Sequence, residues 1–351
     1  MTIDITRRRF LSATGSGFAL AATSGLSMPA FAQDKTALSM ILNWRYQGPQ
    51  AWFFLAEDNG YFSDAGIDMQ MDQGNGSGAA VGQVAGGAYD IGFGDVNALI
   101  RLAASKPEEA PICVYQMYNK PPFTVAVLSK SDIKTAKDLE GRKLGGAVND
   151  GALKLFPAFT SVAGLDDSGI EILNFKPNLR EQMLKTEQVE GVFGYVNTIR
   201  FSAKLSGMNP DEDIRFISYG DYGMDLYSNG LIVPKAMVEE QPDMVQGLVT
   251  AINRGVADTL ADPDAAIDAV AKREPLIDKV IEKERLIATL QDEMAHPELA
   301  ETGLGGVDPE RFEKAIDIVV EANELPRTPA IDEIYTDAFL PPEEERIFAL
   351  L

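Results

Sequence analysis

Two of the side chains that most often do chemistry are nearly missing from this chain. Its 351 residues include one histidine, His296, and one cysteine, Cys113. A thiolate cluster or a histidine-based metal site needs several such ligands. The remaining reactive groups are carboxylates, lysines and arginines. We therefore predict no metal site. The residue counts alone leave a bound organic cofactor open, and the sequence as a whole leads us to predict none.

A glycine-rich stretch, "GNGSGAAVGQ", is the first candidate for a binding site. Gly74-x-Gly76-x-x-Ala79, with Asp95 about 20 residues further on, satisfies a loose dinucleotide fingerprint. The strand before it alternates apolar and polar residues, whereas a Rossmann first strand is a continuous apolar run. A helix start that offers the free N–H groups of Ser77 and Gly78 to a ligand is the favoured interpretation. Tight packing of a turn remains open.

Polar and aromatic residues also follow two predicted strands. Open α/β sheets bind ligands at the carboxyl ends of their strands. The residues in these positions are Trp44, Arg45, Tyr46, Asp95 and Asn97. Two other interpretations stay open: Trp44 in the core with Arg45 at the surface, and Asp95 with Asn97 as helix caps only.

The elements that position these residues alternate between strands and helices through the first two thirds of the chain. This order predicts an α/β fold with mainly parallel sheets, and the length predicts two lobes. The pattern restarts after Pro121 and Pro122. A short helix is expected over residues 49–59, and nearly continuous helix from Pro234 to about Met294. Asp262-Pro263 and Asp308-Pro309 are predicted helix starts.

The N-terminal residues resemble an export signal. Arg7 and Arg8 precede a weakly apolar stretch and a small-residue site at Ala30 and Ala32, which is typical of a twin-arginine signal cut near Ala32. We therefore expect a periplasmic protein with no stable membrane insertion. The formal net charge of −22 excludes nucleic acid as a partner.

Several segments in order, "ILNWRYQGPQAWFFLAEDNGYFSDAGIDM", "VAGGAYDIGFGDVNAL", "DLEGRKLGG" and "NGLIVPKAMVEEQ", resemble the SsuA/THI5-like (NMT1) family. The resemblance implies a two-lobed type II periplasmic binding protein fold with two hinge crossings. It divides the chain into a signal (1–32), lobe 1 (33–123 and 230–351) and lobe 2 (124–229). The crossings are expected near Pro122–Val125 and Tyr227–Ile232. An ABC permease and its ATPase are the implied partners, and a sensing partner is the alternative.

The same family includes enzymes that make the thiamine pyrimidine with an active-site histidine and a cysteine-rich loop. This chain reads "RYQGPQAW" and "DYGMDLYSNG" at those places, with Gln50 and no histidine or cysteine. His296 could replace the missing histidine only if it entered the cleft. The resemblance therefore favours a binding protein without catalytic residues over an enzyme.

The positions that match cleft loops of the family form the predicted ligand site. The aromatic members, which favour a planar ligand by stacking, are Trp44, Tyr46, Phe123, Tyr195, Tyr222 and Tyr227. The polar members are Arg45, Gln50, Ser77, Gly78, Asp95, Asn97, Asn197, Asp221 and Asn229. This set favours a pyrimidine precursor of thiamine or a related heteroaromatic. The alternative is a sulfonate or nitrate held by Arg45 or Arg200.

Overall fold

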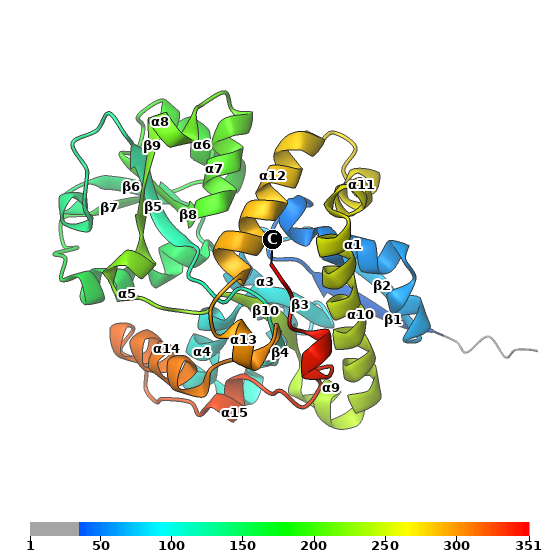
Figure 1. Ribbon diagram of the computed structural model, residues 1–351. Coiled ribbons are helices and arrows are strands. Elements are labelled where there is room, and N and C mark those ends of the chain that lie inside the picture. The colour runs from blue at the N-terminus through cyan, green and yellow to red at the C-terminus, as the bar shows by residue number, and fades with distance from the viewer. Residues whose placement is uncertain (1–34, 351) are drawn as a thin grey trace, which may run out of the picture. The chain divides into compact units, whose positions relative to one another are not determined.

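The chain folds around two five-stranded sheets. The computed structural model describes residues 35–350, so the predicted signal over residues 1–32 lies outside the described residues. Both sheets and the helices around them appear in Figure 1. No helix within residues 35–350 is long and apolar enough to cross a membrane.

The first sheet has the strand order β2-β1-β3-β10-β4. Its strands are β1 (Thr36–Ile41), β2 (Ile67–Asp72), β3 (Ile91–Asp95), β4 (Ile112–Gln116) and β10 (Asn229–Val233). The second sheet has the order β7-β6-β8-β5-β9. Its strands are β5 (Phe123–Leu128), β6 (Lys143–Gly146), β7 (Glu171–Asn174), β8 (Gly191–Tyr195) and β9 (Ile214–Ser218).

Each sheet defines a lobe. We call residues 35–116 and 229–350, built on the first sheet, lobe 1, and residues 123–222, built on the second, lobe 2. Two connecting segments, residues 117–122 and 223–228, join the sheets. They hydrogen-bond to one another, because the Ser228 N–H donates to the Tyr118 carbonyl at 2.9 Å.

The prediction of mainly parallel sheets is confirmed for four of the five strands in each sheet, and one antiparallel strand makes each sheet mixed. β1 pairs in parallel with β2 and β3, but β10 runs antiparallel to both β3 and β4. In the second sheet, β5 is likewise antiparallel to β8 and β9. The reason is topological: β5 and β10 each enter their sheet directly from the other lobe, without the helical crossover that a parallel strand requires.

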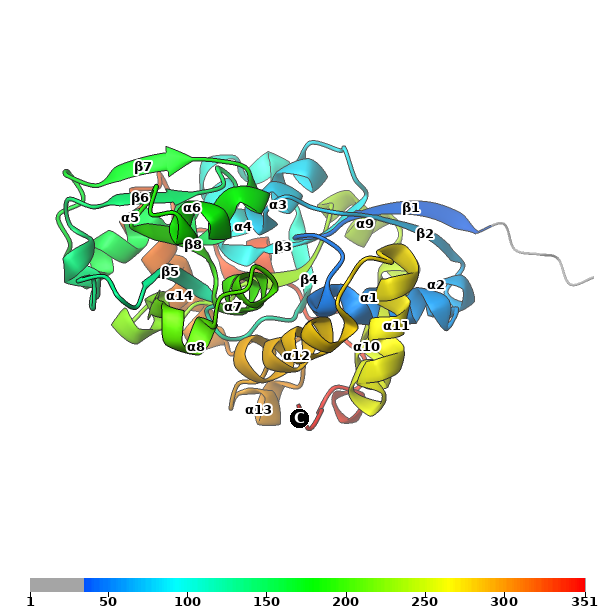
Figure 2. The same ribbon diagram turned by 90° about the horizontal axis from the view of Figure 1, so that it is seen from above.

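Helices of lobe 1 cover the first sheet and extend beyond it (Figures 1 and 2). They are α1 (Ala51–Asp58), α2 (Tyr61–Asp64), α3 (Ser77–Ala85), α4 (Val96–Ser105), α9 (Lys235–Glu240), α10 (Pro242–Ala261), α11 (Pro263–Arg273), α12 (Lys279–Thr289), α13 (Leu299–Thr302), α14 (Pro309–Ala322) and α15 (Ile331–Ile334). A π-helical turn, η6 (Leu290–Met294), continues α12.

Lobe 2 carries fewer helices. They are α5 (Gly151–Ala163), α6 (Arg180–Lys185), α7 (Val196–Leu205) and α8 (Pro210–Asp213). Short 3-10 turns complete the fold: η1 (Gly48–Gln50), η2 (Pro107–Glu109), η3 (Ala136–Leu139), η4 (Pro177–Leu179), η5 (Tyr219–Tyr222) and η7 (Glu343–Glu345). Helix α12 of lobe 1 packs beside α7 of lobe 2, as both views show.

Local sequence explains most of these boundaries. β2 buries Ile67, Met69 and Met71 and exposes Asp68 and Gln70 between them, as its period-two pattern predicts. The predicted helix over residues 49–59 is confirmed as η1 followed by α1. The helix starts at Asp262 and Asp308 are also confirmed, because each carboxylate accepts a first-turn N–H.

Candidate functional site

A pocket between the two lobes gathers buried polar groups from both. Its free space is about 20 Å³, room for about one water molecule. The lobes therefore lie in close contact here. Lobe 1 contributes Asn43, Trp44, Gly76 and Ser77, and lobe 2 contributes Asp150, Gly151, Arg180, Tyr195 and Thr198.

The lobe 1 wall is the loop after β1. Asn43 and Trp44 follow that strand after one residue, Leu42. The side chain of Asn43 is held by Gln50, whose Nε2 donates to Asn43 Oδ1 at 2.8 Å. Gln50 thus orients a pocket residue without lining the pocket itself.

Gly76 brings the lobes together at the start of α3. Its φ of 148° lies in the region that favours glycine. A Cβ at this position would lie 2.4 Å from the carbonyl oxygen of Asn149 in lobe 2. Only glycine therefore allows the two backbones to approach this closely.

Tyr195, the last residue of β8, links the lobes by hydrogen bonds. Its hydroxyl lies 2.8 Å from Ser77 Oγ and 2.9 Å from Ser228 Oγ, and it donates to Asn229 Oδ1 at 3.1 Å. Burial, with a contribution from the nearby Asp95, raises the pKa of Tyr195 well above its usual value. The hydroxyl therefore stays protonated and serves as a neutral hydrogen-bonding group.

Arg180 is the cationic group of the pocket, and acidic groups already hold it. Its Nε and Nη2 both donate to Glu181 Oε1, at 2.9 and 2.8 Å, and its Nη1 lies 3.9 Å from Asp150 Oδ2. Its guanidinium carbon lies 5.8 Å from the ring centre of Trp44 across the lobe junction. Only 4% of Arg180 is exposed.

Asp150 begins α5 as its N-cap, accepting the N–H groups of Ala152 and Leu153 at 2.9 and 3.4 Å. Burial raises the pKa of Asp150 above its usual value, and the charge of Arg180 offsets only part of this effect. The pair is buried, so any ligand that displaced one partner would have to replace its hydrogen bonds.

A second polar layer lies behind the pocket. Asp95 and Asn229 stand opposite one another on β3 and β10, and both are fully buried. Asp95 Oδ1 accepts from the backbone and side-chain N–H groups of Asn97, while Asp95 Oδ2 and Asn229 Nδ2 have no hydrogen-bond partner within residues 35–350. Burial raises the pKa of Asp95 to about 6.

Most of the predicted site residues gather in or beside this pocket. Trp44, Ser77 and Tyr195 line it. Phe123 packs edge-on against Tyr195 at 5.4 Å, and a Cβ on Gly78 would face the Asn149 carbonyl at 3.7 Å. The others nearby are Arg45 and Tyr46, which line adjoining hollows, and Asn197, which is buried beside Thr198.

Three predicted residues lie away from the pocket. Asp221 is exposed, and Tyr222 Oη accepts the Ala136 N–H at 2.9 Å while its ring packs against Phe159 inside lobe 2. Tyr227 packs against Phe312 of lobe 1. Their segment bends away from the pocket before it returns as β10.

The remaining candidates for chemistry also lie elsewhere. Arg200 pairs with Asp292 at 3.6 Å, and His296 lies 3.6 Å from Glu298. Burial raises the pKa of Cys113 to about 12, so this thiol is unreactive. Within residues 35–350, no group of three His, Cys, Asp or Glu residues could hold a metal ion.

The predicted ligand site did not include six of the lining residues: Asn43, Gly76, Asp150, Gly151, Arg180 and Thr198. Asp150 carried a signal, since it follows a strand and precedes a helix in the same way as Ser77 does in lobe 1. Arg180 carried none, because the packing of α6 against β8 brings it to the pocket.

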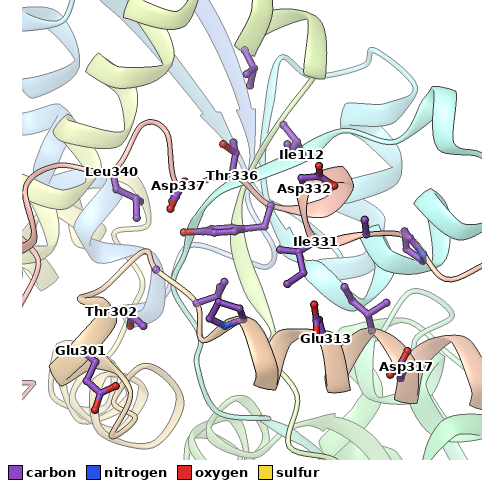
Figure 3. Close-up of a pocket in the computed structure, with 18 of the residues that line it drawn as sticks. Ile112, Glu301, Thr302, Glu313, Asp317, Ile331, Asp332, Thr336, Asp337 and Leu340 are labelled. Atoms are coloured by element: carbon purple, nitrogen blue, oxygen red, sulfur yellow. The ribbon is translucent and has the colours of Figure 1, made fainter.

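A larger hollow of about 1120 Å³ lies on lobe 1 alone, between α14 and the C-terminal segment (Figure 3). Its carboxylates, which include Glu313, Asp317, Asp332 and Asp337, are exposed to solvent. We assign the candidate site to the small interlobe pocket instead, because buried polar groups from two lobes converge there.

The chain is similar to several known proteins. A family model described as NMT1/THI5 like matches residues 49–266. The riboflavin-binding protein RibY of Chloroflexus aurantiacus is 24% identical, over 92% of this chain and 90% of its own length. The formylaminopyrimidine-binding protein of Halalkalibacterium halodurans is 24% identical, over 81% of this chain and 86% of its own.

Other similar proteins differ in activity. A 4-amino-5-hydroxymethyl-2-methylpyrimidine phosphate synthase of Legionella pneumophila is 21% identical, over 70% of this chain and 76% of its own length. Among solved structures, the alkanesulfonate-binding protein SsuA of Xanthomonas axonopodis pv. citri, bound to MOPS, superposes with a TM-score of 0.66. It is 14% identical and covers 86% of this chain and 99% of its own, which establishes a periplasmic binding protein fold.

Proposed function

Because this chain belongs to the NMT1/THI5-like family, we propose that it is a solute-binding protein that closes its lobes on a small planar heteroaromatic ligand. A pyrimidine related to the thiamine precursors is the favoured ligand class. The proposed cycle is one in which an open form admits the ligand, the lobes close, and the closed form delivers it to an ABC permease in the periplasm.

The state of Arg180 supports a neutral or cationic ligand over an anion. Its guanidinium is shared between Glu181 and Asp150. An incoming sulfonate would have to compete with both carboxylates in a poorly hydrated pocket, where like charges repel strongly. An amino group on a ring meets acceptors here instead, at Asp150, Asn43 and Ser77.

Trp44 supports the planar shape of the ligand. Its indole forms part of the lobe 1 wall and is half-buried, so it offers a stacking surface when the lobes separate. An aromatic contact adds about 0.5–1.5 kcal/mol beyond the burial of area. The relatives that bind riboflavin and formylaminopyrimidine have heteroaromatic ligands, which agrees with this assignment.

A synthase of the pyrimidine phosphate type is the competing function, because relatives with that name match this chain. The lining of the pocket favours binding instead. The side chains that line it include no imidazole, thiol or lysine amine. They belong to Asn43, Trp44, Gly76, Ser77, Asp150, Gly151, Arg180, Tyr195 and Thr198. Signalling through a sensor kinase is another function that would use the same pocket. A permease gene adjacent to the gene for this protein would favour transport over signalling.

Mass spectrometry of the small molecule that natively purified protein releases on denaturation tests the ligand class. We expect a heteroaromatic amine. Trp44→Ala should weaken its binding about tenfold or more, a loss of about 1.4 kcal/mol. Tyr222→Phe is the matched control, since that ring lies outside the pocket, and it should bind normally.

A second variant tests the role assigned to Arg180. Glu181→Gln removes the carboxylate that occupies Nε and Nη2, so it should improve binding of MOPS, measured by calorimetry. Wild-type protein that already binds MOPS more tightly than any pyrimidine would overturn the heteroaromatic assignment and restore the anion alternative.

A further inference from the structure

Both segments that connect the lobes meet at one side chain, Arg311. This arginine lies in the first turn of α14 in lobe 1, and its side chain is 11% exposed. Its Nη2 donates to the Asn119 carbonyl at 2.6 Å in the first segment. Its Nε and Nη2 also hold both oxygens of Asp225, at 3.0 and 2.8 Å, in the second segment.

Further contacts fix the arginine itself. Its guanidinium carbon lies 4.1 Å from the ring centre of Tyr227, and its Nη1 donates to Glu298 Oε1 at 3.0 Å. The Tyr227 hydroxyl donates to Glu298 Oε2 at 2.8 Å and accepts the Asp308 N–H at 2.9 Å. A planar guanidinium that bridges several acceptors in this way is geometrically specific, and lysine cannot reproduce the arrangement.

We propose that Arg311 is a positioning residue of the hinge, which holds both connecting segments against lobe 1. Lobe motion then pivots on the lobe 2 side of Asn119 and Asp225. None of the partners of Arg311 lines the interlobe pocket, so the residue controls the relative placement of the pocket walls without touching a ligand. The inference rests on the proposed function only in taking lobe movement as the working motion.

Hydrogen exchange of ligand-free protein tests the clamp directly. The Tyr118 and Ser228 amides report on the two segments, since each donates across the connection at 2.9 Å. In Arg311→Met, exchange should rise about tenfold in peptides covering residues 117–122 and 223–228, which corresponds to about 1.4 kcal/mol of easier local opening. Arg311→Lys should give a smaller rise in the same two segments.

The control is Arg327→Met. Arg327 also pairs with a carboxylate, Glu333, and donates to a backbone carbonyl, that of Ala103, but it lies away from the connecting segments. It should leave exchange at residues 117–122 and 223–228 unchanged. If Arg311→Met does not fold, Asp225→Asn replaces it, because that aspartate is largely exposed and its loss frees the second segment.

A second measurement follows the distance between the two lobes. Leu205→Cys and Leu276→Cys carry spin labels on exposed residues of opposite lobes that line one hollow, and the buried Cys113 is not labelled. Arg311→Met should broaden the distance distribution between the labels. An unchanged width, or faster exchange throughout the chain instead of in the two segments, would overturn the hinge role and leave the ligand assignment intact.

Discussion

Asp95 is a buried carboxylate behind the pocket whose chemistry departs from that of an ordinary surface carboxylate. Burial raises its pKa to about 6 from 3.8, and one of its oxygens has no partner within residues 35–350. The folded protein therefore binds the proton more tightly than the unfolded chain does. By linkage, the stability contributed by this proton is complete below about pH 4 and is lost as the pH rises to about 6.

Asp95→Asn should remove this pH dependence. Asparagine still accepts the Asn97 N–H as an N-cap but carries no charge, so the free energy of unfolding at pH 7.5 should rise by about 1–3 kcal/mol. The gain should disappear below about pH 4. Urea unfolding of both proteins across this range measures it, and a difference that does not change with pH would contradict the raised pKa.

The residues that the sequence prediction and the candidate pocket share are those whose position is decided by local order. Trp44, Ser77 and Tyr195 each follow or end a strand, and the edge of a sheet brings such residues together whatever the details of packing. Tyr227 shows the limit. It lies just before a strand, but it contacts Arg311, which belongs to a helix more than 80 residues later in the chain. No local sequence pattern specifies that contact.

At the scale of elements, the start of α3 is a place where the backbones of the two lobes approach closely. The positive φ of Gly76 and its contact with the Asn149 backbone both exclude a side chain. A Cβ there cannot be accommodated by rotating a side chain, because the obstacle is a backbone carbonyl. We therefore expect the helix start to act as a spacer that sets how far the lobes can close.

Gly76→Ala should fold but stop short of full closure. With the ligand that mass spectrometry identifies, the spin-label distance between positions 205 and 276 should stay longer than in the unmodified protein. Gly82→Ala is the control in the same helix, since nothing lies within 4 Å of its Cβ position. That change should add about 0.5–1 kcal/mol of stability. Equal distances in both variants would exclude the spacer role.

The elements themselves were largely predictable, but the one antiparallel strand in each sheet was not. Alternation within β2 and the caps at Asp262 and Asp308 are local features, so sequence located them. The antiparallel insertion of β10 depends on the chain leaving lobe 1 after β4 and returning 112 residues later, between Gln116 and Asn229. Hydrophobic patterning specifies burial, and it contains no information on that return.

The whole molecule is held together by more than the two connecting segments. One continuous core cluster includes Phe93 from the first sheet and Phe193 from the second. Helix α12 adds a seam with α7, where Lys204 pairs with Glu284 and Arg285 lies over the Phe201 ring. A second, smaller cluster, which contains Leu184 and Val192, belongs to lobe 2 alone. The shared core predicts that the lobes unfold together.

Leu184→Ala tests this coupling. Leu184 is 1% exposed in α6 of lobe 2, so its truncation should cost about 2–5 kcal/mol. Trp52 is buried in lobe 1, whereas Trp44 faces Arg180 of lobe 2, so every variant is made in a Trp44→Phe background. Fluorescence then reports on lobe 1 while circular dichroism reports on the whole chain. In urea, both midpoints should fall by the same amount, and Leu276→Ala, at a residue that is 92% exposed, should move neither. A dichroism midpoint that falls while the fluorescence midpoint stays fixed would mean that the lobes unfold separately, and that the interlobe contacts serve closure alone.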